Sequence, residues 1–221
     1  MATTIAQLRT LARQRADMEN SNFVGSTELD GYLQDSYAEL YDLLVGKHQD
    51  YYVAEPEEFS LANGEYTYAL PSDFYKLLGV DVSLSGRWRD LDPFNFNERN
   101  VTASARRELG RYASVRYRVI GQSLHLAPAD GAEGSYRLWY VPTCPALTTV
   151  GSMDAVSDKW RDYVVVDTAI KMLAKEESDT TVLERAKMAL LQRIEAAAAA
   201  VDAGRSARVT DVRSDRYRED Y

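Results

Sequence analysis

Residues 114–142, SVRYRVIGQSLHLAPADGAEGSYRLWYVP, carry the clearest β pattern of the chain. Hydrophobic and polar residues alternate in three short runs, which are separated by Gly121 and by a glycine-containing loop. Alternation with a period of two is typical of strands that bury one face. The stretch therefore predicts strands of a small antiparallel sheet, with these residues turned to one side: Val115, Tyr117, Val119, Leu124, Leu126, Tyr136, Leu138 and Tyr140.

The chain before this stretch is also rich in strand-forming residues. Residues 51–71, YYVAEPEEFSLANGEYTYALP, predict a β-hairpin with Asn63-Gly64 at its tip, because Asn-Gly favours the tight turns that join paired strands. Residues 72–84 predict a short turn of helix and then a strand that includes Val80 and Val82. A short helix is expected over residues 93–105.

Helical patterns lie on both sides of the β region. Residues 3–16 and the segment that begins at Ser26 place apolar side chains at steps of three and four, which predicts two helices. A second pair of helices is expected from Asp158 onward, with a break at residues 178–180. Gly204 suits the position after the end of the last helix.

This order of elements predicts a mainly α protein of the α+β class. The outer helices can bury their apolar faces only against each other, so we expect a helical bundle from the N- and C-terminal helices. A small antiparallel β subdomain is inserted between them, and an extended C-terminal arm follows. The predicted domains are residues 1–50 for the first helices, 51–150 for the β-rich subdomain, 151–203 for the returning helices and 204–221 for the arm.

The composition is ordinary for a globular protein, with 45% hydrophobic and 27% charged residues among 221. A net charge of −8 argues against a surface that holds nucleic acid everywhere. No stretch approaches the roughly 20 apolar residues of a membrane span, so no membrane contact is expected. With Cys144 as its one cysteine the chain forms no intrachain disulfide, which favours assembly in a reducing cytoplasm.

The sequence holds no specific signal for catalysis, for a cofactor or for a metal. Glycine-rich phosphate loops are absent, and His48, His125 and Cys144 lack the spacing of a zinc site. A nucleophilic pair of Cys144 with His125 stays open at this level. However, Cys144 lies between two prolines without a helix N-terminus to activate its thiol, which favours a plain loop cysteine. We therefore expect no enzyme activity, no cofactor and no metal.

Basic and aromatic residues cluster at two places. One cluster is Arg87, Trp88 and Arg89, and the other places tyrosines among Arg106, Arg107, Arg111, Arg116 and Arg118. Arginine beside aromatic side chains can hold phosphates and stack on bases, and it can equally meet carboxylates on a partner protein. In an acidic protein we favour contact with a protein, followed by a solvated face and then by DNA.

The last residues, ARVTDVRSDRYREDY over 207–221, hold little that could pack into a core. Such a segment is either a solvated terminus or an arm that becomes ordered on a partner. Its alternating charges suit a charge-complementary groove, and Tyr217 and Tyr221 are the expected aromatic anchors.

Several phrases, taken in order, resemble the head-to-tail adaptor proteins of tailed bacteriophages. FVGSTELDGYLQDSYAELYDLL, residues 23–44, resembles the N-terminal helix region of that family, and LPSDFYKLLGVDV, residues 70–82, resembles a phrase that follows a tyrosine-rich strand there. A Trp-containing hairpin at Gly86-Arg87-Trp88, a strand ending in LWYVP and helices returning from KWRDYVVVDTAIKMLAKEESD continue the likeness. It covers nearly the whole chain, and the order of the phrases carries it.

The resemblance implies a structural protein of the virion, located at the capsid vertex. It implies a ring of twelve copies under the portal protein, which extends the channel for the packaged DNA and docks the tail or a second connector protein. In this family the bundles of neighbouring copies pack side by side, and the C-terminal segment reaches onto the portal.

These implications assign roles to the clusters described above. The arm becomes the portal-binding segment, with the candidate residues Arg205, Arg208, Val209, Asp211, Val212, Arg213, Arg216, Tyr217, Arg218 and Tyr221. Arg87, Trp88 and Arg89 become a candidate tail-docking hairpin. The arginines between residues 106 and 118 become candidates for contact with a neighbouring subunit or with the DNA channel. Two alternatives are a tail-side completion protein without portal contact, and a DNA-binding packaging or regulatory protein that uses the Arg106–Arg118 patch.

Overall fold

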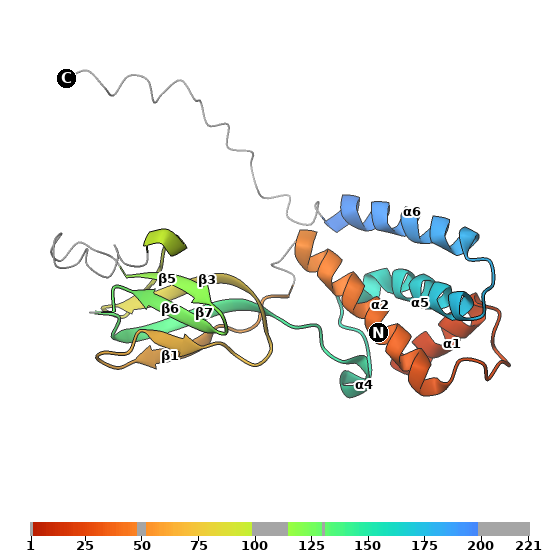
Figure 1. Ribbon diagram of the computed structural model, residues 1–221, viewed down its shortest axis with the longest axis horizontal. Helices are drawn as coiled ribbons and strands as arrows, with labels where there is room; N and C mark the ends of the chain where they lie inside the picture. Colours follow the sequence, from red (N-terminus) through yellow and green to blue (C-terminus); the bar gives the residue numbers. More distant parts are fainter. Residues whose placement is uncertain (1, 48–51, 99–114, 130, 199–221) are drawn as a thin grey trace, which may run out of the picture. The chain divides into compact units, whose positions relative to one another are not determined.

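The computed structural model describes residues 2–47, 52–98, 115–129 and 131–198. It is an α+β structure that falls into two compact units (Figure 1). The helical unit comprises Met1–His48 and Ser152–Tyr221, and the β unit comprises Gln49–Gly151. Each unit is built from the segments in which the sequence predicts its type of element. The four predicted domain ranges stay a prediction.

Two helices at the start of the chain belong to the helical unit. Helix α1 (Ile5–Arg15) begins with a capping box, in which the Gln7 backbone N–H donates to the Thr4 hydroxyl and the Gln7 side chain accepts from the Thr4 backbone N–H. Helix α2 (Ser26–Lys47) follows the expected period of three and four. Its buried residues include Leu29, Leu33, Tyr37, Leu40 and Leu44.

The returning helices differ from each other in burial. After a 3-10 turn η4 (Ser157–Trp160), helix α5 (Arg161–Lys175) contacts α1, α2 and α6 and buries nearly every residue of its middle. Helix α6 (Thr181–Ala198) lies on α5 and α2, and of its described side chains only Ile194 is buried. The sequence predicts one apolar stripe on each of these helices. On α6 the less exposed residues include Leu183, Ala186, Leu190 and Ile194, at the spacing of one apolar face, whereas α5 is buried over a wider part of its surface.

The β unit consists of two antiparallel sheets. The first has the order β1-β7-β3-β4, and the second has the order β2-β6-β5. The strands are β1 (Glu57–Leu61), β2 (Thr67–Ala69), β3 (Phe74–Leu84), β4 (Arg87–Asp90), β5 (Arg116–Ile120), β6 (Ser123–Ala127) and β7 (Gly134–Pro142). A short helix α4 (Leu147–Val150) ends the unit and buries Leu147.

The two sheets pack face to face as a sandwich. Their shared core contains Phe59, Val80, Leu138 and other residues of the first sheet, together with Tyr117, Leu124 and other residues of the second. The Phe59 ring stacks on the Tyr68 ring of the other sheet with centroids 3.9 Å apart. The two outer faces of the sandwich therefore point in opposite directions.

The expected hairpin at Asn63-Gly64 is wrong. The turn itself is present, since Gly64 has a φ of +88° and the Glu65 N–H donates to the Ala62 carbonyl at 3.0 Å. However, β1 pairs with β7 and β2 pairs with β6, so the turn carries the chain from one sheet to the other. The stacking of Phe59 on Tyr68 across the core replaces lateral pairing of the two strands.

The expected turn of helix after Pro71 is also wrong, because β3 runs without interruption from Phe74 to Leu84. Its pairing with β7 shifts register between Phe74 and Lys76 and again between Leu77 and Gly79. These irregularities break the alternation of inward and outward residues, which explains the misleading pattern. Of the helix expected over 93–105, a 3-10 turn η2 (Phe96–Glu98) is present, and the residues from 99 on lie outside the described part.

Candidate interaction surfaces

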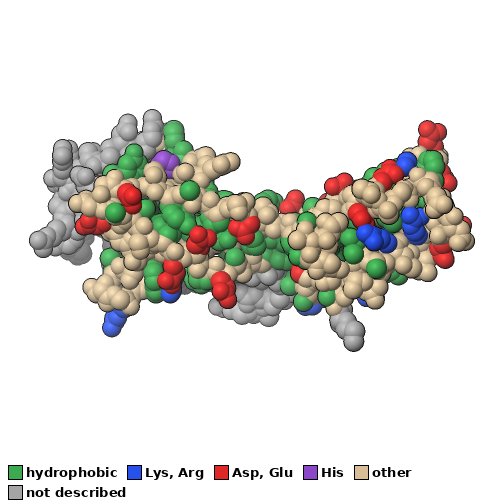
Figure 2. All heavy atoms as spheres, turned by 90° about the horizontal axis from the view of Figure 1, so that it is seen from below, with side chains coloured by type: hydrophobic (Ala, Val, Ile, Leu, Met, Phe, Trp, Pro, Cys, Tyr) green, Lys and Arg blue, Asp and Glu red, His purple; other side chains and the backbone are tan. Residues whose placement is uncertain are grey.

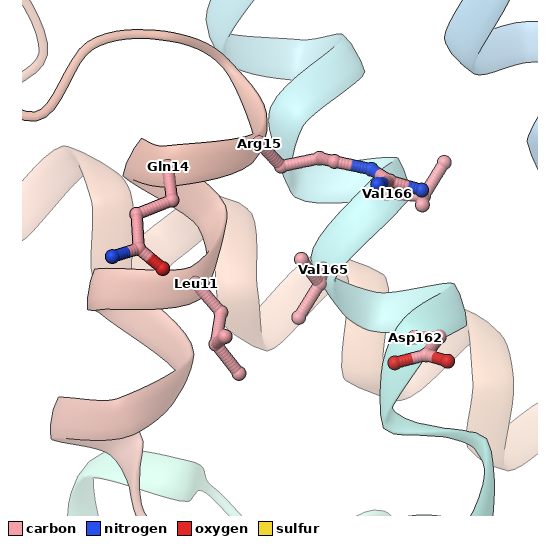
Figure 3. A pocket seen from close by; sticks show the side chains of 6 residues that line it. All are labelled: Leu11, Gln14, Arg15, Asp162, Val165 and Val166. Carbon is pink, nitrogen blue, oxygen red and sulfur yellow. The ribbon is translucent and has the colours of Figure 1, made fainter.

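A groove runs between α1 and α5 of the helical unit. It encloses a cavity of about 330 Å³ lined by Leu11, Gln14 and Arg15 of α1 and by Asp162, Val165 and Val166 of α5 (Figure 3). Leu11 is 36% exposed, which is unusual for an apolar residue of a packed helix face. The charged ends of Arg15 and Asp162 flank the apolar floor. This mixture suits a segment of another protein better than a small molecule.

A second hollow of about 660 Å³ continues along α1 toward its start. Leu11 lines both hollows, and Arg161 of α5 borders the second one. Its other lining residues are Ala2, Thr3, Thr4, Ala6, Gln7 and Thr10. Most of these side chains are small or polar.

Charged residues lie inside the helical unit between α2, α5 and α6. Asp167 of α5 is 3% exposed, and its Oδ1 accepts from the Lys187 ammonium of α6 at 2.7 Å. The same ammonium lies 2.9 Å from Glu39 of α2, and the Lys171 ammonium lies 2.9 Å from Asp167 Oδ2. Burial opposes ionisation of the Asp167 carboxyl, but hydrogen bonds from Lys187 and Lys171 outweigh it and lower its pKa. The network fixes α6 to the rest of the unit.

The outer face of the first sheet carries a row of charged residues across all its strands. Glu58 of β1, Arg137 of β7, Asp81 of β3 and Asp90 of β4 are paired in register. The Arg137 guanidinium donates to Glu58 at 2.7 Å and lies 3.9 Å from the centre of the Trp88 ring. We call these residues, Glu58, Asp81, Trp88, Asp90 and Arg137, the acidic face.

The predicted hairpin residues belong partly to this face. The β3–β4 turn has Ser85 at a φ of +53° and Gly86 at +78°, the left-handed pair that a tight hairpin requires. Trp88 pairs with Ser83 and lies on the acidic face with Arg137. Arg87 and Arg89 alternate with it and are exposed on the other side of β4. Thus the structure separates Trp88 from its two arginine neighbours.

The outer face of the second sheet has a different character. Arg118 of β5, His125 of β6 and Thr67 of β2 form one row in register, and Arg116 lies on the same side of β5. The Arg118 guanidinium donates to the Phe94 carbonyl at 2.9 Å and lies 5.9 Å from the Phe96 ring. We call Arg116, Arg118 and His125 the basic face. The other predicted arginines, Arg106, Arg107 and Arg111, lie outside the described residues.

The two predicted clusters therefore contribute to opposite faces of one sandwich. Figure 2 shows acidic side chains, in red, spread among hydrophobic ones over the visible surface of the β unit. Nothing in the local sequence groups Glu58, Asp81, Asp90 and Arg137 together. The alternation that marks inward residues also marks these as outward, but only the strand order shows that they share a row.

The remaining candidate residues give no site in the described part. The Cys144 thiol is half-buried beside the Pro145 carbonyl at 3.7 Å, and His125 belongs to the basic face. Within residues 2–47, 52–98, 115–129 and 131–198, no group of His, Cys, Asp and Glu could hold a metal ion. The same residues include no helix long and apolar enough to span a membrane. All portal-binding candidates between Arg205 and Tyr221 lie beyond them.

The family model described as SU10 adaptor protein matches residues 3–216, which includes both units and most of the C-terminal segment. A search of curated proteins finds no match to the chain.

Proposed function

Because the chain belongs to the SU10 adaptor protein family, a family of phage head-to-tail adaptors, we propose that it forms a ring of twelve copies beneath the portal protein. The ring extends the DNA channel at the capsid vertex and docks the tail or a second connector protein. The family match over residues 3–216 carries this proposal. The chain acts by binding other proteins, and its assembly takes place in the cytoplasm of the host bacterium.

The helical unit has surfaces that suit side-by-side packing in such a ring. The groove with Leu11 and Val165 opens between α1 and α5. On α6, Val182 is 72% exposed and Met188 is 62% exposed, which leaves apolar surface on the helix that forms the outer layer. A ring needs two different complementary surfaces on each copy, and these two surfaces of the helical unit would supply them.

The C-terminal arm is the proposed anchor on the portal. Residues 204–221 alternate arginines with acidic residues and add Tyr217 and Tyr221, which are side chains typical of interface hot spots. An arm without its own core loses conformational entropy only when its partner orders it. A net charge of −8 also suits a conduit, because DNA must pass without being held.

The test is the mass of the purified protein, alone and mixed with its portal protein. The full chain is expected to join the portal as a ring. A chain that ends at Ala203 is expected to lose this association, because it lacks the anchor. The matched control keeps residues 204–221 in scrambled order, so that length and charge stay constant while the sequence of contacts changes. It should behave like the truncated chain.

Other outcomes would favour the alternatives. If neither the full chain nor the truncated chain touches the portal, the adaptor role fails and a tail-side completion protein becomes the better explanation. If the full chain binds duplex DNA with a steep salt dependence and does not bind the portal, the arginines of the basic face serve DNA instead.

A further inference from the structure

The β unit presents opposite charges on opposite sides. The acidic face holds Glu58, Asp81 and Asp90 against Arg137, while the described residues in register on the basic face include Arg116, Arg118 and His125 and no carboxylate. Since the two sheets pack face to face through their cores, these surfaces are the front and the back of one sandwich.

Such a sandwich has the form that a closed ring requires. A ring is built from head-to-tail contacts, in which a surface on one copy meets a different surface on the next. A symmetric contact of two acidic faces, or of two basic faces, would set like charges against each other. A contact of an acidic face with a basic face sets unlike charges against each other, so that they attract. The same contact can repeat between every pair of neighbours around the ring.

We propose that the β units of neighbouring copies stack front to back, with the acidic face of one copy on the basic face of the next. The inference rests on the ring proposed above and adds to it a second contact, made by the β units in addition to the helical units. The partner is thus a second copy of this chain. Carboxylates of Glu58, Asp81 and Asp90 meet the guanidinium groups of Arg116 and Arg118.

Side chains on both faces are held in place within each copy. Arg137 is fixed between Glu58 and the Trp88 ring, and the Trp139 indole N–H donates to Asp81 at 2.7 Å. Arg118 is held by the Phe94 carbonyl and lies over the Phe96 ring. Side chains that are already ordered lose less entropy on association, so the contact costs less to form. Tryptophan and arginine are also the residue types enriched in interface hot spots.

Cysteine cross-linking in assembled portal–adaptor particles tests the direction of stacking. In a Cys144→Ser background, the pair Asp90→Cys and Arg116→Cys places one thiol on each face. Mild oxidation of this variant is expected to give a ladder of disulfide-linked multimers on a non-reducing gel, because each copy links to two neighbours. The two single-cysteine variants are the matched controls and should give no ladder.

Charge reversal gives an independent readout that needs no disulfide geometry. Asp90→Arg alone and Arg116→Asp alone each set like charges across the contact and should lower the fraction of copies retained on the portal as salt is raised. The double variant restores opposite charges in every copy and should recover retention. Recovery by the double variant also shows that neither substitution in itself prevents the chain from folding.

Each other outcome overturns the inference. Dimers from a single-cysteine variant would show symmetric packing, and portal-bound rings without a ladder would show that the β units do not stack, while the proposed function stands. If the chain does not join the portal, the proposed function fails. The variant with both cysteines is then oxidised as the concentrated free chain, and absence of a ladder there also rejects stacking. Duplex DNA binding that Arg116→Asp abolishes, without a ladder, would assign the basic face to DNA.

Discussion

The helical unit holds charged side chains in its interior, whereas the β unit keeps them on its outer faces. In the first, Asp167 and Lys187 are packed between three helices. In the second, the core consists of apolar and tyrosine side chains, and Glu58 and Asp81 face outward. The buried charges fix helices to one another, whereas Glu58 and Asp81 bind Arg137 and Trp139 of the same sheet and lie on its outer surface. The first set orders the unit itself, and the second set lies on the surface that the proposed stacking would use.

Removing the buried carboxylate is expected to have the largest effect. Asp167→Ala leaves the Lys187 ammonium without its closest partner between the helices and should lower the free energy of unfolding by about 4 kcal/mol, as for other broken buried ion pairs. Urea denaturation measures the loss, and hydrogen exchange assigns it to α5 and α6. Asp90→Ala, on the surface of the β unit, is the matched control and should change stability by less than about 0.5 kcal/mol.

A double variant sharpens this prediction. Lys187→Met removes the ammonium, so that Asp167→Leu combined with Lys187→Met should restore much of the stability that either single change removes. If the effects of the single changes simply add, the two side chains do not interact in solution and the network is not what fixes α6.

A core substitution in the β unit gives the next largest effect. Phe59→Ala removes a ring that stacks on Tyr68 and on Tyr136, whose ring centre lies 5.4 Å away, and should cost about 3 kcal/mol. The loss should appear in the exchange rates of β1, β2 and β7. Phe59→Leu keeps an apolar side chain and should cost clearly less. Equal losses in both units would show that they unfold as one body, against the prediction of separate domains.

The sequence predicts the elements of both units better than their pairing. Helical periodicity is a property of one segment, so α1 and α2 follow from their own residues. Strand pairing depends on residues far along the chain. No signal near Glu58 indicates that β1 lies beside β7 and not beside β2.

For the same reason the candidate surfaces could be predicted only in part. Trp88 and Arg118 are candidate residues because each lies among basic and aromatic residues in the sequence. In the structure Trp88 lies beside Arg137, and Arg118 donates to the Phe94 carbonyl. Phe94 is in place because backbone hydrogen bonds join residues 92–94 to the edge of β5. The sequence therefore indicates the right strands, and it places Arg116 and Arg118 together as the structure does, but it does not show which side chains of other strands lie beside Trp88.

Acid should destabilise the helical unit at a higher pH than the β unit. In the helical unit, burial opposes ionisation of Asp158 as well, but hydrogen bonds from Thr3 outweigh it and lower its pKa, as the lysines do for Asp167. A lowered pKa contributes stability above the ordinary value for aspartate, and this stability is lost as the pH falls through the lowered value. Hydrogen exchange between pH 5 and pH 2 should therefore show the helical unit opening before the β unit.

Alkaline pH should destabilise both units together, because both contain tyrosines with raised pKa values. Burial, together with the hydrogen bond to Glu57, raises the pKa of Tyr68 to about 12, and burial raises the pKa of Tyr163 in the helical unit. A raised pKa contributes stability that is lost as the pH rises from the ordinary value through the raised one. Simultaneous opening of both units in acid would contradict the comparison, whereas simultaneous opening in alkali is expected.

The smallest expected effect compares one buried hydroxyl in each unit. The Tyr136 hydroxyl donates to the Ala132 carbonyl at 2.7 Å, so Tyr136→Phe leaves a buried acceptor unsatisfied and should cost about 1–2 kcal/mol. The Tyr163 hydroxyl is directed toward Glu39 and Lys187, but no described residue offers it hydrogen-bond geometry. Tyr163→Phe should therefore change the free energy of unfolding by less than about 0.5 kcal/mol, measured by urea denaturation. A loss as large as that of Tyr136→Phe would mean that Glu39 accepts from Tyr163 in solution, so that the polar network of the helical unit includes this tyrosine as well as the lysines.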